Sequence, residues 1–174
     1  IQEGEIHLDL RPTKVEDIIE EVVDNLDTLI RSGKVMVNLE IVSGPLPKVE
    51  TDPEKLKRVM ANLLSNAVKY TLPGGRVKIT AQKVGATVKV TIADTGVGIS
   101  KADQKKIFTK FFRSIRVLKF SPDGTGLGLF ITKSLINAMG GKVGFSSEEN
   151  KGTTFYVILP LEGMKKKEGT KTLG

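Results

Sequence analysis

Residues 87–99 read TVKVTIADTGVGI, a run of β-branched residues that ends on an acid and two glycines. The β-branched part, Thr87 to Ala93, predicts a strand. A buried carboxylate costs energy and glycine weakens a strand, so we expect Asp94 at the strand end, in a pocket beside flexible backbone. There the carboxylate can accept a hydrogen bond from an exocyclic amine such as that of adenine, and the glycines allow a flat ring to approach the main chain. A simple turn capped by Asp94 is the alternative interpretation.

The composition fits a single domain with a substantial core. The 174 residues are 39% hydrophobic and 27% charged, close to the globular average. The absence of cysteine excludes disulfides and thiolate metal sites. No segment approaches the ~20 apolar residues of a membrane span, and the N-terminus lacks a signal-peptide pattern. We therefore expect a cytoplasmic domain without direct membrane contact, in a protein that N-terminal regions outside this sequence could attach to the membrane.

The net charge of +7 raises the question of a nucleic-acid partner. The segment from Gly163 to Gly174 carries +3 of this charge, and its composition predicts a flexible basic tail. The rest of the chain is mildly basic, and aromatic residues make up 5% of the sequence, too few for a base-stacking surface. We predict one domain over residues 1–162, a tail over residues 163–174, and no nucleic-acid partner.

Hydrophobic periodicity predicts the remaining helices and strands. Alternating apolar residues predict a strand over residues 6–10 that ends at Pro12. Thr13 followed by Glu16 matches a capping box and predicts a helix that continues to Ser32. Further strands are expected over residues 35–42, 76–84, 86–93, 142–146 and 153–159, and further helices over residues 53–69, 101–107 and 127–139.

The helix that follows Asp52 carries an unusual polar face. Asn62, Ser65, Asn66 and Lys69 share one side because residues three, four and seven apart lie on the same face of a helix. Two asparagines one turn apart are poor helix formers. Asparagine oxygen suits Mg²⁺ that is bound to phosphates, and Lys69 would add positive charge. A solvated polar face or a buried amide network is the alternative.

A glycine cluster, Gly124, Gly126 and Gly128, opens the last predicted helix. Free N–H groups at a helix start meet the positive end of the helix dipole and suit an anion such as a polyphosphate. The spacing differs from the Rossmann fingerprint and lacks the Lys-Ser/Thr of a P-loop. A helix cap alone would need one glycine rather than three.

Four motifs occur together: NLLSNAVKYT at residues 62–71, DTGVGI at 94–99, IFTKFFR at 107–113 and GTGLGL at 124–129. In this order they resemble the N, G1, F and G2 boxes of the ATP-binding catalytic domain of bacterial sensor histidine kinases. The resemblance runs from about Asp9 to Pro160. It implies an α/β fold of the Hsp90, gyrase B and MutL superfamily (the Bergerat or GHKL fold), a two-layer sandwich with a mixed, mostly antiparallel sheet under three main helices.

The resemblance also implies the roles of individual residues. Asp94 would receive the adenine amino group, Gly96, Gly98 and Ile99 would form the base pocket, and Thr153 would hold the adenine side through water. Asn66 would ligate Mg²⁺ with support from Asn62, while Lys69 and Tyr70 would touch the phosphates or ribose. Gly124, Thr125, Gly126, Leu127 and Gly128 would hinge a lid over residues 113–123 and present N–H groups to phosphate, and Arg113 would steady the γ-phosphate. Asn66, Lys69 and Arg113 would be the catalytic residues.

By this resemblance the chain binds ATP with Mg²⁺ and donates the γ-phosphoryl group to a histidine on a separate dimerisation and phosphoacceptor domain. Its other partner would be a response regulator, and the isolated chain would be monomeric. The acceptor histidine belongs in a helical hairpin before the domain, whereas His7, the one histidine in the sequence, lies in a predicted strand. We therefore expect the chain to phosphorylate nothing by itself.

Related ATP hydrolases place a glutamate one turn before the metal-binding asparagine, to activate water. Asn62 occupies that position here and cannot act as a base, so free ATPase activity should be low. Two other functions fit parts of the sequence. A non-catalytic adenine-nucleotide sensor that gates a partner needs only the binding residues, and a nucleic-acid binder would depend on the basic tail and show a steep salt dependence.

Overall fold

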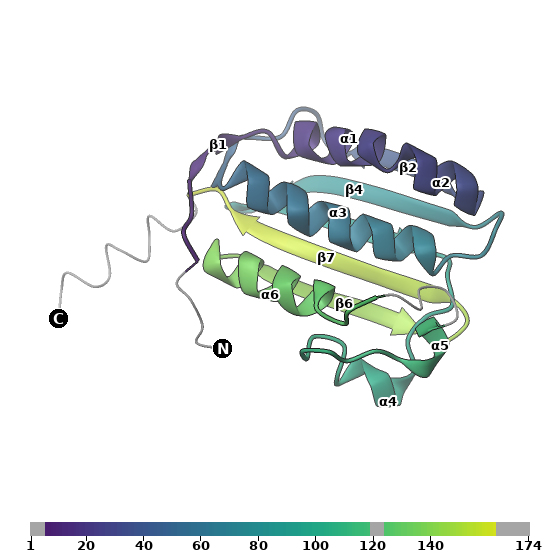
Figure 1. Cartoon of the computed structure of the whole chain (residues 1–174). Helices are drawn as coiled ribbons and strands as arrows, with labels where there is room; N and C mark the ends of the chain where they lie inside the picture. The colour runs from purple at the N-terminus through teal and green to yellow at the C-terminus, as the bar shows by residue number, and fades with distance from the viewer. Residues whose placement is uncertain (1–5, 119–123, 163–174) are drawn as a thin grey trace.

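The computed structural model, which describes residues 6–118 and 124–162, has helices packed on one face of a five-stranded sheet (Figure 1). The strand order is β2 (Met36–Ile41), β4 (Arg76–Val84), β5 (Thr87–Asp94), β7 (Gly152–Pro160) and β6 (Lys142–Glu148). β2 runs parallel to β4, and the other neighbours are antiparallel. The predicted mixed, mostly antiparallel sheet is confirmed. The predicted basic tail and residues 119–123 of the predicted lid lie outside the described residues.

The helical layer consists of α1 (Val15–Asn25), α2 (Asp27–Gly33), α3 (Pro53–Lys69) and α6 (Gly128–Ala138) (Figure 1). The predicted helix over residues 13–32 is therefore two helices, because the last turn of α1 tightens at Leu26, whose N–H contacts the carbonyls of both Val22 and Val23. Two short helices, α4 (Lys101–Gln104) and α5 (Ile115–Leu118), lie in the connection between β5 and α6. No helix in the described part of the chain is long and apolar enough to cross a bilayer.

The N-terminal strand lies later than the sequence pattern predicts. β1 (Arg11–Thr13) includes Pro12 and pairs antiparallel with β3 (Val49–Thr51) in a small second sheet. Proline is tolerated because each strand of a two-stranded sheet is an edge. The predicted capping box is also wrong. The Thr13 hydroxyl donates to the carbonyl of Arg11, and Glu16 accepts from the N–H of Leu46 at 2.9 Å, so neither side chain caps α1.

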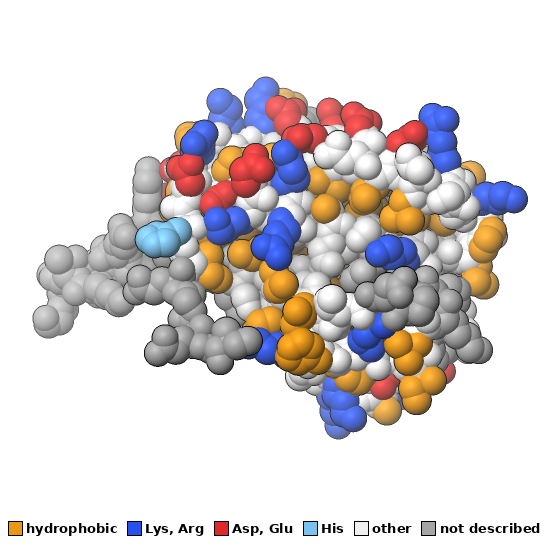
Figure 2. Space-filling model, viewed as in Figure 1, with side chains coloured by type: hydrophobic (Ala, Val, Ile, Leu, Met, Phe, Trp, Pro, Cys, Tyr) orange, Lys and Arg blue, Asp and Glu red, His pale blue; other side chains and the backbone are white. Residues whose placement is uncertain are grey.

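One core lies between the helices and the sheet. α3 sits at its centre and buries one apolar face along its whole length. The buried side chains of α3 and of the facing strands β4 and β5 are Leu56, Val59, Met60, Leu63, Leu64, Ala67, Val68, Val77, Ile79, Ala81, Val88, Val90 and Ile92. Figure 2 shows that acidic side chains gather over α1 on the outer face of the helical layer. Because the apolar face of α3 packs on the sheet, the polar face of the C-terminal half of α3 is held in a fixed position near the end of β5.

Asp52 caps α3 and ties the N-terminal segment to it. Its Oδ1 accepts the N–H groups of Glu54 and Lys55, both at 3.1 Å, and its Oδ2 accepts the N–H of Asp9 at 2.9 Å. Burial by itself raises the pKa of Asp52, but the hydrogen bonds from Asp9 and Lys55 outweigh it and hold the pKa below its usual value.

Asp52→Ala is expected to lower the free energy of unfolding by about 1–2 kcal/mol at pH 7, the usual cost of losing a helix cap. A carboxyl whose folded pKa is depressed stabilises the fold above its unfolded pKa, and that contribution disappears as the pH falls through the folded pKa. Urea unfolding at several pH values should therefore show the difference shrinking in acid. Asp24→Ala, at an exposed position of α1, is the matched control. If the difference in unfolding free energy between the unaltered chain and Asp52→Ala were as large at low pH, the ionised Asp52 carboxylate would not be its cause.

Candidate functional site

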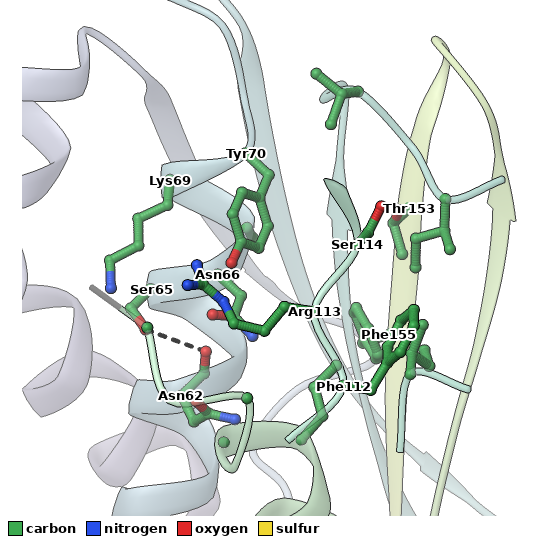
Figure 3. Close-up of a pocket in the computed structure, with 18 of the residues that line it drawn as sticks. Asn62, Ser65, Asn66, Lys69, Tyr70, Phe112, Arg113, Ser114, Thr153 and Phe155 are labelled. Carbon is green, nitrogen blue, oxygen red and sulfur yellow. Dashed lines mark hydrogen bonds between the residues drawn. The ribbon is translucent and has the colours of Figure 1, made fainter. Parts of the chain in front are cut away.

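A cavity of about 400 Å³ lies between the C-terminal half of α3, the end of β5 and the start of α6 (Figure 3). It brings together residues that are up to 93 positions apart in the sequence, from Asn62 to Phe155. The predicted site residues that line it are Asn62, Asn66, Lys69, Tyr70, Asp94, Gly98, Ile99, Arg113, Gly124, Thr125, Gly126, Gly128 and Thr153. Gly96 and Leu127 do not line it: Gly96 lies in the turn after β5, and Leu127 precedes the first residue of α6.

Asp94 is the last residue of β5 and is held by backbone amides. Its Oδ1 accepts the N–H of Gly96 at 2.9 Å and the N–H of Thr153 at 3.2 Å. Burial raises the pKa of Asp94, and these two hydrogen bonds offset the rise only in part. Its Oδ2 accepts no hydrogen bond from the residues that the structure describes and is not sealed from solvent. The carboxylate therefore presents one fixed oxygen and one available acceptor.

The backbone beside Asp94 approaches the next strand pair closely. Gly98 has φ +67°, and a Cβ at this position would lie 2.1 Å from the carbonyl oxygen of Glu148. Only glycine fits such a contact without a shift of backbone. The loop after β5 thus lies flat against the β6–β7 turn, where the N–H of Asn150 also donates to the carbonyl of Val97 at 2.7 Å.

The two asparagines of α3 have different surroundings. The Asn62 Nδ2 donates to the hydroxyl of Thr132 on α6 at 2.8 Å, which fixes the orientation of the amide. The Asn66 carboxamide lines the cavity and makes no hydrogen bond to the described residues. The Asn66 amide is therefore available to a ligand in the cavity. Asn62 is therefore the positioned amide and Asn66 the available one.

Two positively charged side chains, Lys69 and Arg113, lie near Asn66 in the cavity (Figure 3). Lys69 follows Asn66 by three residues, so it lies on the same face of α3 and lines the same cavity. Figure 3 shows the Arg113 side chain reaching from the loop after α4 toward Asn66 and Tyr70. Burial raises the pKa of Tyr70, and the nearby Arg113 lowers it in part. In the part of the chain that the structure describes, no group of three or more His, Cys, Asp or Glu side chains is placed to hold a metal ion.

The glycine cluster forms part of the cavity wall beside Asn62. α6 begins at Gly128, so the first-turn N–H groups, which have no partner within the helix, and the positive dipole end of the helix lie at the cavity. The carbonyl of Gly126 accepts the N–H of Phe111 at 3.0 Å, which ties the cluster to the loop that carries Arg113. A Cβ on Gly128 would lie 2.4 Å from Asn62 Oδ1. This close approach explains why glycine occurs there.

Gly128→Ala is expected to weaken ATP binding about tenfold, since the methyl group forces the Asn62 amide away from Thr132 or moves α6. Alanine favours the helix, so the free energy of unfolding should change by less than about 1 kcal/mol. Calorimetric titration with ATP measures the first quantity and urea unfolding the second. Gly33→Ala, where the added Cβ makes only ordinary contacts at 3.6 Å, is the control and should bind ATP normally. Unchanged ATP affinity in Gly128→Ala would show that the close contact between Gly128 and Asn62 does not matter for ATP binding.

The apolar lining of the cavity was not predicted from the sequence. The additional lining residues are Ser65, Ala67, Val97, Ile107, Phe112, Ser114, Leu129 and Phe155. Phe155 belongs to an aromatic cluster in which its ring centroid lies 5.8 Å from that of Phe145 and 6.5 Å from that of Phe108. Apolar residues in helical or strand patterns indicate a core, and nothing in the pattern separates those that face a cavity. Ser65 is the exception, because it shares the polar face of α3.

The sequence model of the family described as histidine kinase-, DNA gyrase B-, and HSP90-like ATPase matches residues 51–163. The circadian input-output histidine kinase CikA of Synechococcus elongatus is 32% identical over 92% of this chain and 21% of its own length. The signal transduction histidine-protein kinase BarA of Escherichia coli is 32% identical over 93% of this chain and 18% of its own length. The chain thus spans about a fifth of the length of these relatives.

Solved structures agree with this assignment over nearly all of the described fold. The catalytic domain of the histidine kinase ThkA is 30% identical, with a TM-score of 0.77 over 88% of this chain and 97% of that domain. Full-length ShkA, solved in complex with AMPPNP, is 31% identical, with a TM-score of 0.78 over 91% of this chain and 32% of its own. The chain therefore belongs to the histidine kinase-, DNA gyrase B-, and HSP90-like ATPase family and is a catalytic domain of the histidine kinase type.

Proposed function

We propose that this domain binds ATP with Mg²⁺ in the cavity and donates the γ-phosphoryl group to a histidine of a separate dimerisation and phosphoacceptor domain. The observation that carries the proposal is that one cavity joins two complementary ends. Asp94 offers a fixed hydrogen-bond acceptor for a purine amino group at one end. Asn66, Lys69 and Arg113 gather an available amide and two cations at the other end. The AMPPNP complex of ShkA supports nucleotide binding by this family.

The charges of the site suit phosphoryl transfer, which depends on positioning and charge stabilisation more than on covalent chemistry by the protein. Lys69 and Arg113 would hold the phosphate oxygens, and the N–H groups at the start of α6 would bind them from the other side. Asn66 would hold Mg²⁺ through its amide oxygen, a hard neutral ligand that fits an ion also bound by phosphates. When bound, the ion would neutralise charge on the transferring group.

Asn62 accounts for the expected low hydrolysis. Its amide has no basic group to take a proton from water, and its nitrogen already donates to Thr132. The phosphoryl group would therefore persist until an acceptor histidine enters the open side of the cavity. The structure of ThkA in complex with its response regulator protein TrrA supports a response regulator as the later partner. We place the reaction in the cytoplasm, where ATP and response regulators meet.

The test mixes the purified chain, labelled Mg-ATP and a separately produced phosphoacceptor domain of the parent protein. We expect acid-labile phosphate on the acceptor domain and slow phosphate release from the chain alone. ATP binding without phosphoryl transfer would contradict the kinase function and favour a non-catalytic nucleotide sensor. Rapid release of phosphate without an acceptor would contradict the role given to Asn62.

A further inference from the structure

Ser147, on β6, is half-buried and belongs to a hydrogen-bond network around Thr153, the strand partner of Asp94, and no motif indicated it. Its Oγ donates to the carbonyl of Gly152 at 3.0 Å and accepts the N–H of Ile99 at 2.9 Å. The same Oγ lies 2.8 Å from the hydroxyl oxygen of Thr153, a contact in which either hydroxyl could donate. Gln104 supports this arrangement from α4, because its Nε2 donates to the carbonyls of Ile99 and Ser147.

The proton count of Ser147 settles which hydroxyl donates. A serine hydroxyl carries one proton, and the Gly152 carbonyl can only accept a hydrogen bond. The Ser147 proton is therefore directed to Gly152, and Thr153 must give its own proton to Ser147 Oγ. The Thr153 hydroxyl makes no other hydrogen bond with the described residues. It consequently faces the cavity with lone pairs only.

Two hydrogen-bond acceptors thus line the base end of the cavity, Asp94 Oδ2 and Thr153 Oγ1. Asp94 lies on β5 and Thr153 lies opposite it on the neighbouring strand β7. We propose that Ser147 is a specificity-determining positioning residue, which holds the Thr153 hydroxyl as an acceptor and so favours 6-amino purines over 6-oxo purines. An amino group brings two donors to such a site, directly or through a water molecule. A 6-oxo group brings an acceptor, which finds no donor there. The inference rests on the proposed function and deepens it.

The test measures the ratio of the dissociation constants of ITP and ATP by calorimetry, because the two nucleotides differ at the 6-position. In Ser147→Ala, the Thr153 proton is released and can turn toward a 6-oxo group. We expect the ratio to fall about fivefold, the worth of one neutral hydrogen bond. Ser146→Ala, at an exposed position on the opposite face of β6, should keep the original ratio.

A second pair of variants separates positioning from damage to the fold. Ser147→Ala also leaves the Ile99 N–H without its partner, and a distorted loop would weaken ATP and ITP binding alike. Thr153→Val has no hydroxyl to turn, so adding Ser147→Ala to it should leave the ratio unchanged. Equal loss of affinity for both nucleotides, or the same change of ratio in the Thr153→Val background, would overturn the inference and leave the proposed function intact. Absence of ATP binding by the unaltered chain would overturn both.

Discussion

Asp94→Asn is expected to weaken ATP binding about 100-fold or more, the largest effect of any single substitution in the base end of the cavity. In the native site, Oδ1 accepts the N–H groups of Gly96 and Thr153. The asparagine oxygen will keep those two bonds, because no other arrangement satisfies both amides. The asparagine Nδ2 then takes the place of Oδ2 and points a donor at the donor of an adenine amino group.

The same substitution should leave the fold intact, which allows the two effects to be separated. Burial raises the pKa of Asp94, so the charged carboxylate is less favourable in the folded chain than in water at neutral pH. A neutral amide removes that cost, and the free energy of unfolding should not fall. Calorimetry with ATP and urea unfolding measure the two quantities, and Asp27→Asn on the exposed side of α2 is the control. A near-native ATP affinity in Asp94→Asn would show that Asp94 does not recognise the base.

The sequence predicted well those features whose cause is local. The β-branched run before Asp94 is a strand because its residues fit a half-buried sheet, and the helix after Asp52 begins where proline and a capping acid place it. Errors arose where the cause was a distant partner. The strand expected over residues 6–10 lies at Arg11–Thr13, because β3, its partner, fixes the pairing register. The sequence pattern has no information about that partner.

The candidate site shows the same division. Polar residues in unusual places, such as two asparagines on one face of α3, could be predicted because they violate local preference. The contact between Asn62 and Thr132 joins residues 70 positions apart and needs the packing of α3 against α6. Ser147 lay in an ordinary strand pattern, and its role depends on three neighbours from other segments. Chemistry that departs from local rules is visible in a sequence, whereas the groups that orient it are not.

Asn66→Ala is expected to abolish the contribution of Mg²⁺ to ATP binding. The Asn66 carboxamide is the available amide of α3, so its loss removes a ligand without breaking a hydrogen bond between described residues. ATP affinity in the presence of magnesium should fall about 100-fold, toward the value measured with EDTA, and phosphotransfer should fall at least as far. Helix propensity favours alanine over asparagine, so the free energy of unfolding should not decrease.

Calorimetric titrations with and without magnesium distinguish this loss from general damage to the site. Asn66→Ala should bind ATP with the same affinity in both buffers, whereas the unaltered chain should bind more tightly with magnesium. Asn137→Ala, at an exposed position near the end of α6, is the control and should keep the difference. A magnesium effect of full size in Asn66→Ala would transfer the metal role to another group. Asn62 would be the first candidate, because only its nitrogen is engaged by Thr132 and its oxygen borders the same cavity.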